Sequence, residues 1–481
     1  MAGEQTTALS DLGWLYHPTF PDSWRRSKLY PLAGWTNGMA FRNINFSVVG
    51  RPVIKIAEIK NGISGQTQFT DAEYDSDYLV RKGDMLFSWS GQPESSIDAF
   101  WWRGPEGWLN QHVFKVQPDR LQCRADFFFY LLKYLKPIFI GIARNKQTTG
   151  LGHVTKKDLE EIEVRLPGEA LQRAIAHILG TLDDKIEMNR RMNETLEAMA
   201  RALFKSWFVD FDPVRAKQNR RSRESGNPEI KDLDARFLGH DGCGLPKPLA
   251  DLFPDSFEDS ELGEIPKGWK IEPLSEITTV ITKGTTPTQS ETATADKDDG
   301  EVNYVRVNAI DEDGTVLFEK LTTIPESVHL GILKRSVLQA GDVLYTIAGT
   351  IGRSAIVDES LLPANTNQAI AIIRPKQPIP PAFLVMTMRA AAFREELHSN
   401  IVHAVQANLS LGMLSRARTV VPPKNNLLQL FMPIADLAKR VASARAESRT
   451  LAALRDMMLP KLISGELRIE GAKRIIERAT A

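Results

Sequence analysis

Short polar and basic side chains gather in several predicted loops of this chain, where they could donate hydrogen bonds and hold anions. Amide, hydroxyl and guanidinium groups of this kind read base edges and bind phosphates in nucleic-acid complexes. The candidates in the first half are Lys60, Asn61, Ser64, Gln66, Thr67, Ser90, Gln92, Arg144, Asn145, Lys146, Gln147, Thr148 and Thr149. The candidates in the second half are Lys283, Gly284, Thr285, Thr286, Arg353, Asn367, Gln368, Gln406 and Asn408. Each could instead be a solvated loop residue or a turn cap, so the prediction concerns the group.

Two polar pairs, Asn110–Gln111 and Asn367–Gln368, each stand just before an apolar strand pattern. Because they recur in register beside buried strands, their side chains could bond backbone groups inside the protein. An internal role and a binding role both stay open for these pairs.

Catalytic and metal-binding patterns are absent from the sequence. There is no GxxxxGK[ST] loop, no glycine-rich strand-to-helix fingerprint and no Asn-Pro-Pro-aromatic segment of the adenine methyltransferase type. Cys123 and Cys243 stand far apart, without the Cys or His neighbours that a zinc site needs. We therefore expect a binding protein with no catalytic residues and no metal site, and not an enzyme.

The bulk composition is that of an ordinary soluble protein. The chain has 481 residues, of which 42% are hydrophobic, and its 60 basic and 60 acidic residues cancel. Zero net charge argues against a nonspecific nucleic-acid coat, and it supports an alternative in which the chain is a protein-interaction scaffold that never touches DNA. No apolar run is long enough to span a membrane and the first residues lack a signal pattern, so we expect a cytoplasmic protein.

The candidate loops are positioned by a repeat with a period of half the chain. Pro167 opens a long helical pattern that reaches Lys205, and Pro423 opens another that reaches Lys461, with both pairs 256 residues apart. Such a repeat predicts two similar modules, each followed by a helix of the same length.

Further matches occur in the same order within each half. An alternating apolar pattern, taken as a strand, ends at Ile59 in the first half and at Ile310 in the second. A Gly-Asp turn then precedes a short apolar strand, at Gly83 and at Gly341. An aromatic-rich helix predicted at 125–136 corresponds to one at 382–397. The modules are therefore predicted to be β-rich with minor helices.

The two long helices carry apolar residues at alternating spacings of three and four, which is typical of a coiled-coil seam. The first seam is predicted at Leu171, Ile175, Ile178, Leu182, Met192, Leu196, Met199 and Leu203, with Asn189 and Lys185 as polar interruptions. The second is predicted at Leu430, Ile434, Leu437, Val441, Ala444, Leu451, Leu454 and Met458, interrupted by Ser448.

Three long segments, 179–217, 249–269 and 454–467, resemble conserved regions of the specificity subunit of type I restriction-modification systems. They include the motifs FDPVRAK, at 211–217, and LPKLISGEL, at 459–467. The KGTTP segment that begins at Lys283 is similar to a loop common in the recognition domains of this family. Residues 218–237 depart from the family pattern and are interpreted as an insert in a linker.

The resemblance implies an α+β fold with two β-rich target recognition domains, joined by two long antiparallel helices as a coiled-coil spacer with pseudo-two-fold symmetry. The predicted organisation is recognition domain 1 at 1–168, a central helix at 169–209, a linker with a variable insert at 210–261, recognition domain 2 at 262–423, a C-terminal helix at 424–465 and a tail at 466–481.

The same resemblance implies a function and partners. Each domain would read one half of a split double-stranded DNA target. The helices would set the spacing and dock two methyltransferase subunits, and motor-nuclease subunits could join the assembly. No cofactor is expected in this chain, because S-adenosylmethionine would bind the methyltransferase partner.

Overall fold

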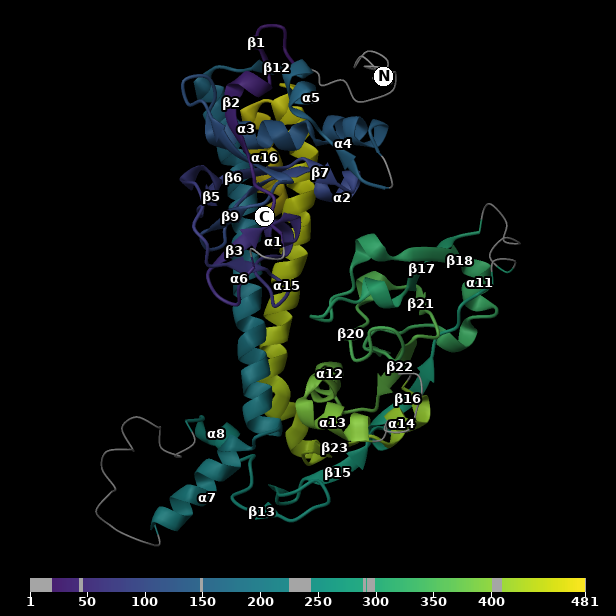
Figure 1. Cartoon of the computed structure of the whole chain (residues 1–481). Helices are drawn as coiled ribbons and strands as arrows, with labels where there is room; N and C mark the ends of the chain where they lie inside the picture. The colour runs from purple at the N-terminus through teal and green to yellow at the C-terminus, as the bar shows by residue number, and fades with distance from the viewer. Residues whose placement is uncertain are drawn as a thin grey trace. The chain divides into compact units, whose positions relative to one another are not determined.

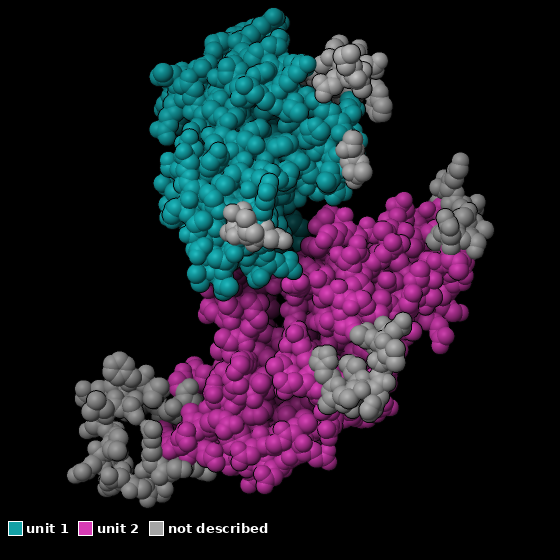
Figure 2. Space-filling model, in the orientation of Figure 1, with its two compact units in different colours: residues 1–191, 444–481 teal, residues 192–443 magenta. Residues whose placement is uncertain are grey.

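The computed structural model describes residues 20–42, 46–147, 150–224, 244–288, 291, 299–399 and 409–480 (Figure 1). The chain divides into two compact units, one made of residues 1–191 with 444–481 and the other of residues 192–443 (Figure 2). Two 40-residue helices, α6 (Glu169–Phe208) and α15 (Lys424–Ile463), pass through the division, so each unit holds one end of both.

The first unit is built on a four-stranded sheet in the order β2-β10-β6-β8, with all neighbours antiparallel. Its strands are β2 (Ala33–Asn37), β10 (Val113–Pro118), β6 (Met85–Ser88) and β8 (Asp98–Trp101). A second sheet has the order β4-β3-β9-β5, in which β3 and β9 are parallel. Its strands are β4 (Phe69–Thr70), β3 (Arg51–Ile54), β9 (Gly107–Leu109) and β5 (Leu79–Val80), and β1 (Arg25–Lys28) pairs separately with β12 (Glu163–Leu166).

The second unit repeats this topology. Its four-stranded sheet has the order β16-β22-β19-β20, and its three-stranded sheet, β18-β17-β21, again contains one parallel pair, β17 with β21. The strands are β16 (Thr278–Lys283), β22 (Ile370–Pro375), β19 (Val343–Thr346), β20 (Ser354–Ile356), β18 (Thr322–Pro325), β17 (Glu301–Val305) and β21 (Ala364–Thr366). The outer pair β15 (Lys270–Pro273) and β23 (Arg418–Val421) corresponds to β1 and β12. The repeat predicted from the sequence is therefore a repeat of strand order and pairing.

Helices pack on these sheets at equivalent places. In the first unit α3 (Ala125–Tyr134) and α4 (Lys136–Asn145) follow β10, and in the second α12 (Pro381–Arg389) and α13 (Ala391–Ser399) follow β22. The single helix predicted at 382–397 is thus two helices, separated at Ala390, whose extended backbone ends α12. Nearly every residue from Phe127 to Tyr134 is buried, which makes α3 the centre of the first core.

The two long helices run antiparallel, as contacts within each unit show. In the first unit Asn189 on α6 lies against Glu447 and Ser448 on α15. In the second unit Phe208 on α6 packs against Phe431 on α15, with ring centroids 6.3 Å apart. The predicted fold class, with two similar β-rich modules and two long antiparallel helices, is confirmed.

The predicted seam of α15 is correct, but part of the seam of α6 is wrong. Met192 and Met199 are 43% and 50% exposed, whereas Asn193 and Ala200, one residue further on, are buried. Spacings of four and three from Leu182 lead through Asn189 to Asn193 and Ala200. Methionine is the more hydrophobic residue, but Asn193 and Ala200 occupy the buried positions, so the true seam lies one residue after the predicted one.

Two further local predictions are corrected by the structure. The strand expected to end at Ile59 stops at Ile54, and Ile56 and Ile59 belong to α1 (Ile56–Asn61), whose Glu58 side chain accepts a hydrogen bond from Lys55 N. Three apolar residues at spacings of two and three fit a strand followed by a helix as well as they fit one strand. The counterpart predicted to end at Ile310 stops at Val305, and Val307 lies in a 3-10 helix, η6 (Val307–Ala309).

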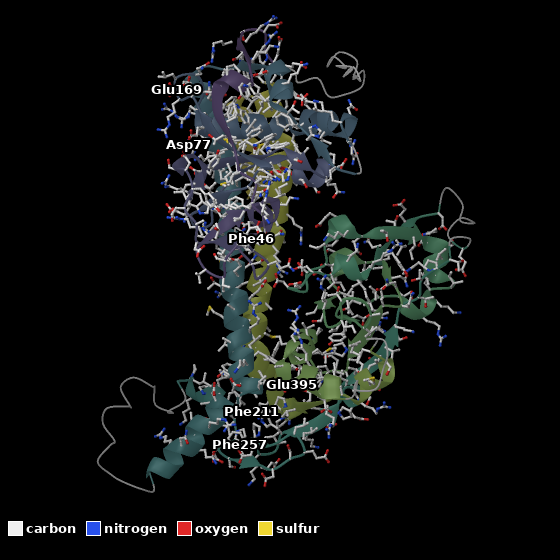
Figure 3. All side chains as sticks on the ribbon, viewed as in Figure 1. Phe46, Asp77, Glu169, Phe211, Phe257 and Glu395 are labelled. Carbon is white, nitrogen blue, oxygen red and sulfur yellow. The ribbon has the colours of Figure 1, made fainter. Side chains whose placement is uncertain are left out.

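The segment predicted as a linker contains α7 (Asp212–Glu224) and α8 (Lys247–Ala250). Lys217 on α7 donates hydrogen bonds of 2.7 Å to Ala250 O and Phe253 O and so ties the two helices together. Phe211 and Phe257, labelled in Figure 3, pack with ring centroids 6.3 Å apart. Across the described residues, no helix is both long and apolar enough to cross a membrane.

Candidate nucleic-acid interface

In each module, the residue that follows the outer strand of the four-stranded sheet, β2 or β16, lies tightly against the segment that leads into the neighbouring strand, β10 or β22. We call this contact the crossing. In the first module Gly38 follows β2, and its N–H donates to Val113 O at 3.1 Å. A Cβ atom at Gly38 would lie 2.1 Å from Asn110 O, which is far inside contact distance. Only glycine fits this crossing.

The second module has the same crossing at Gly284, after β16. Its N–H donates to Ile370 O at 3.2 Å, and a Cβ atom would lie 2.0 Å from Thr366 O. Gly284 was among the predicted site residues, whereas Gly38 was not. The sequence signal for Gly38 is a Thr-x-Gly motif that begins at Thr36 and recurs at Thr282. The two copies are 246 residues apart, whereas the long helices repeat after 256, so the repeat alone does not align them.

The crossing brings three strand ends together at one edge of the sheet in each module. In the first, Asn37 ends β2, His112 precedes β10 and Trp89 follows β6. Trp89 Nε1 donates to Asn37 Oδ1 at 3.0 Å, and the rings of Trp89 and His112 lie 5.8 Å apart. Gln111 Nε2 lies 3.2 Å from His112 Nε2. None of these residues was a predicted contact, although the Asn110–Gln111 pair had been singled out by its position.

At the equivalent edge of the second module, predicted site residues do meet. The Thr286 hydroxyl hydrogen-bonds the Gln368 amide oxygen, and both side chains are exposed, as is Lys283. Behind them the Tyr304 hydroxyl donates to Thr285 O at 2.8 Å. Burial raises the pKa of Tyr304, so that hydroxyl remains a donor and supports the loop.

The asparagines of the two polar pairs serve the turns inside the modules. Asn110 is buried and its Oδ1 accepts from His112 N at 3.5 Å, while Asn367 Oδ1 accepts from Ala369 N at 3.3 Å. The glutamines that follow them, Gln111 and Gln368, lie nearer the solvent.

A second group of predicted residues meets beside the first edge. Strand β7 (Ser90–Gly91) pairs with β11 (Gly152–His153), which places Ser90 and Gln92 next to the segment that follows α4. On α4, the exposed Arg144 donates a hydrogen bond of 2.6 Å from Nε to the Glu94 carboxylate. Lys146 donates to both oxygens of Asp158, at 2.7 and 2.8 Å, so its ammonium is already neutralised. Asn145 and Gln147 are exposed.

The remaining predictions in the first module fall at the end of α1. Lys60, Asn61, Ser64 and Gln66 are exposed. Thr67 is only 7% exposed, and its hydroxyl accepts a hydrogen bond from Ser64 N at 2.9 Å. The side chain of Thr67 therefore holds the loop from within.

Arg353 in the second module is likewise held internally. Its Nη1 donates to Ile310 O at 2.9 Å, and its Nη2 lies 3.5 Å from the Glu312 carboxylate. Four predicted residues, Thr148, Thr149, Gln406 and Asn408, lie outside the described residues.

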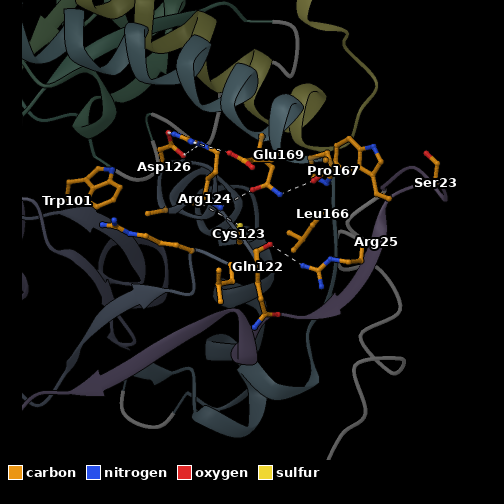
Figure 4. A pocket seen from close by; sticks show the side chains of 16 residues that line it. Ser23, Arg25, Trp101, Gln122, Cys123, Arg124, Asp126, Leu166, Pro167 and Glu169 are labelled. Carbon is orange, nitrogen blue, oxygen red and sulfur yellow. Dashed lines mark hydrogen bonds and ion pairs between the residues drawn. The ribbon is translucent and has the colours of Figure 1, made fainter.

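A cavity of the first unit is lined by residues other than those of the polar edges. It has a volume of about 890 Å³ and lies between the start of α6 and the turn before α3 (Figure 4). Arg124 is paired there with Asp126 at 2.8 Å, and burial raises the pKa of the Cys123 thiol to about 12, so this thiol is not a nucleophile at neutral pH. In the described part of the chain, no group of three or more His, Cys, Asp or Glu side chains could hold a metal ion.

The duplicated fold, with one polar sheet edge in each module, is the architecture of a two-module recognition protein. The family model of the type I restriction modification DNA specificity domain matches residues 21–198 and again residues 266–429. The chain belongs to this family, which confirms the resemblance seen in the sequence. No comparison favours the alternative hypothesis of a protein-interaction scaffold that never touches DNA.

Named relatives agree with this assignment. The chain is 25% identical over 416 residues to the type I restriction enzyme HindI specificity subunit of Haemophilus influenzae, covering 81% of this chain and 87% of that protein. It is 25% identical over 457 residues to the EcoBI specificity subunit of Escherichia coli, covering 93% and 86%. The crystal structure of a type I restriction-modification S subunit from M. genitalium matches with a TM-score of 0.50 at 15% identity, covering 91% of this chain and 96% of that one, which is a likeness of fold.

Proposed function

We propose that this chain is the DNA-reading subunit of a type I restriction-modification complex, in which each module reads one half of a split DNA target. The observation that carries the proposal is the pair of equivalent sheet edges. Both edges are built on the same strand order and the same glycine crossing, but one presents Asn37 and His112 where the other has Lys283 and Ala369. Like scaffolds with unlike side chains suit two unlike half-sites.

In this proposal the domain boundaries are those of the two repeats, near residues 1–168 and 262–423. The antiparallel helices set the distance between half-sites and dock two methyltransferase subunits, which bind S-adenosylmethionine and carry out the chemistry. Motor-nuclease subunits complete the restricting assembly, and the complex acts on DNA in the cytoplasm.

An exchange of the first module tests the proposal. Residues 1–168 are replaced by the equivalent module of a relative with a known target, and the chimera is expressed with its methyltransferase partner. Sequencing of methylated bases in the host genome should then show one half of the target changed and the other half retained. A change in both halves, or in neither, contradicts the modular assignment.

The exposed lysines give a second test, because every phosphate that a lysine neutralises adds to the salt dependence of DNA binding. Neither Lys60 nor Lys283 has an ion-pair partner among the described residues. The slope of log K against log salt is negative, and neutralising either lysine should reduce its magnitude by about 0.9. An equivalent change at Lys146 should have less effect on the slope, because Asp158 already neutralises it.

A further inference from the structure

The amide of Asn37 has only one orientation in this structure. The Trp89 indole N–H can donate but not accept, so the Asn37 atom 3.0 Å from it must be the carbonyl oxygen. Within the described residues, no group accepts a hydrogen bond from the Asn37 amide nitrogen. Because Asn37 is exposed at the end of β2, both of its amide N–H donors face the solvent, while Trp89 engages one of the two lone pairs of its oxygen.

Trp89 is itself fixed by the surrounding strands. Its ring packs against His112 and against Phe114, both at 5.8 Å between centroids. Its backbone N–H donates to His112 O at 3.3 Å, and its carbonyl accepts from Val154 N at 2.8 Å. The indole therefore holds the Asn37 amide in place before any ligand arrives, and such preorganisation lowers the entropy cost of binding.

The second module carries a donor at the equivalent position. Asn37 and Lys283 both end a strand directly before the glycine of the crossing. A lysine ammonium has three donors and no acceptor, so the two residues differ in shape but share this chemistry. An asparagine whose oxygen is free reads adenine through two bonds. With its oxygen tied to Trp89, the Asn37 amide nitrogen suits a single base acceptor such as purine N7, guanine O6 or thymine O4.

We propose that Asn37 is a specificity-determining residue of the first module, donating a hydrogen bond to an acceptor on one base edge, and that Trp89 is its positioning residue. This inference rests on the proposed function and names a contact within it. Gln111 and His112 lie beside Asn37 at the same edge, so the site reads more than one atom of the DNA.

Asn37→Asp is the direct test, because an aspartate keeps the shape and the acceptor for Trp89 but has no N–H to donate. The probes are a duplex carrying the motif that the wild-type complex methylates, found by sequencing, and a scrambled duplex of the same length. With the methyltransferase complex, binding to the motif should fall at least about tenfold, and the ratio of motif to scrambled binding should fall with it. Gln117→Glu adds the same charge at an exposed position on β10 and should leave that ratio unchanged.

Trp89→Phe tests the positioning role, since it keeps a packed ring and removes only the indole N–H. Methylated sites in cells should then relax at a single position of the first half of the motif, with the second half intact. A merely structural role would lower total methylation without relaxing one position.

The outcomes separate this inference from the proposed function. If the Asn37→Asp complex binds the wild-type motif with wild-type affinity and the Trp89→Phe complex methylates only that motif, the Asn37 contact is wrong and the two-module function stands. If either variant changes the second half of the motif, the contact is also wrong. If the wild-type complex recognises no split motif at all, the proposed function itself fails.

Discussion

The Asn189 amide on α6 donates a hydrogen bond of 2.7 Å to the Glu447 carboxylate on α15. Asn189 is 1% exposed and lies on the seam of the two helices, and its Oδ1 is buried with no hydrogen-bond partner among the described residues. A polar residue on such a seam lowers stability while it fixes the register of the helices.

Replacing Asn189 with leucine should therefore stabilise the protein. The change leaves no buried partner unsatisfied, because Ser448 Oγ still donates to Ala444 O at 2.9 Å and Glu447 is partly solvated. The free energy of unfolding should rise by about 1 kcal/mol, as measured by urea denaturation. Asn189→Ala is the control and should lower it, since it leaves a cavity. A leucine variant less stable than the alanine variant would show that the seam cannot accept the larger side chain.

A second polar contact fastens the first module to the helix pair. The Asp183 carboxylate accepts from the Tyr130 hydroxyl at 2.7 Å and from Arg455 Nη1 at 2.7 Å. Burial and then the charge of Asp183 raise the pKa of Tyr130, so its hydroxyl stays protonated and donates.

Replacing Tyr130 should lower the free energy of unfolding less than replacing Asp183 does. Tyr130→Phe should lower the free energy of unfolding by about 2 kcal/mol, the value of a buried hydrogen bond to a charged group. Asp183→Ala should cost about 3 kcal/mol or more, because it leaves both Tyr130 and Arg455 without this acceptor. Denaturation of the purified chain measures both. Equal losses in the two variants would mean that Asp456, which already lies 2.7 Å from Arg455, is enough to hold the guanidinium when Asp183 is absent.

Glu187 gives the protein a predicted dependence on acid. Hydrogen bonds from Arg190, opposed by partial burial and aided by Arg191 and Arg103, lower the pKa of this carboxyl from 4.5 to about 2. The Arg103 bridge, 2.8 Å long, joins the first module to α6. Since the folded pKa lies below the unfolded one, the charged form stabilises the fold above about pH 4.5, and this contribution is lost as the pH falls towards 2.

The measurement is the difference in stability between the wild type and Glu187→Gln as a function of pH. The difference should be constant from pH 7 down to about 5, should shrink between about pH 4.5 and 2, and should vanish below that. Taking the difference cancels the other carboxylates, which titrate in both proteins. A difference that does not change across this window would mean that the three arginines do not favour the charged form of Glu187.

The sequence predicts the architecture better than it predicts the contacts, for physical reasons that particular residues illustrate. The Gly-Asp turns at Gly83 and Gly341 require positive φ and have 95° and 86°, so a local rule identified them. The pairing of Lys146 with Asp158 and of Arg353 with Glu312 depends on where distant segments meet, which no spacing rule encodes. Asn37 was missed because its role depends on Trp89, 52 residues later in the chain.

The crossing glycines provide a prediction for each module separately. A methyl group at Gly38 or Gly284 would meet backbone atoms at 2.1 or 2.0 Å, and backbone cannot rotate away as a side chain can. Gly38→Ala should therefore displace the edge that holds Asn37 and cost about 2 to 3 kcal/mol of stability, with recognition impaired in the first half-site alone. Gly284→Ala should do the same in the second half-site. Gly34→Ala and Gly412→Ala are the matched controls, because only contacts of 3.8 Å or longer surround a Cβ atom at either position. Methylation of target duplexes altered in one half at a time reads out each effect. If Gly38→Ala impaired recognition of both half-sites equally, the two sheet edges would not be independent readers.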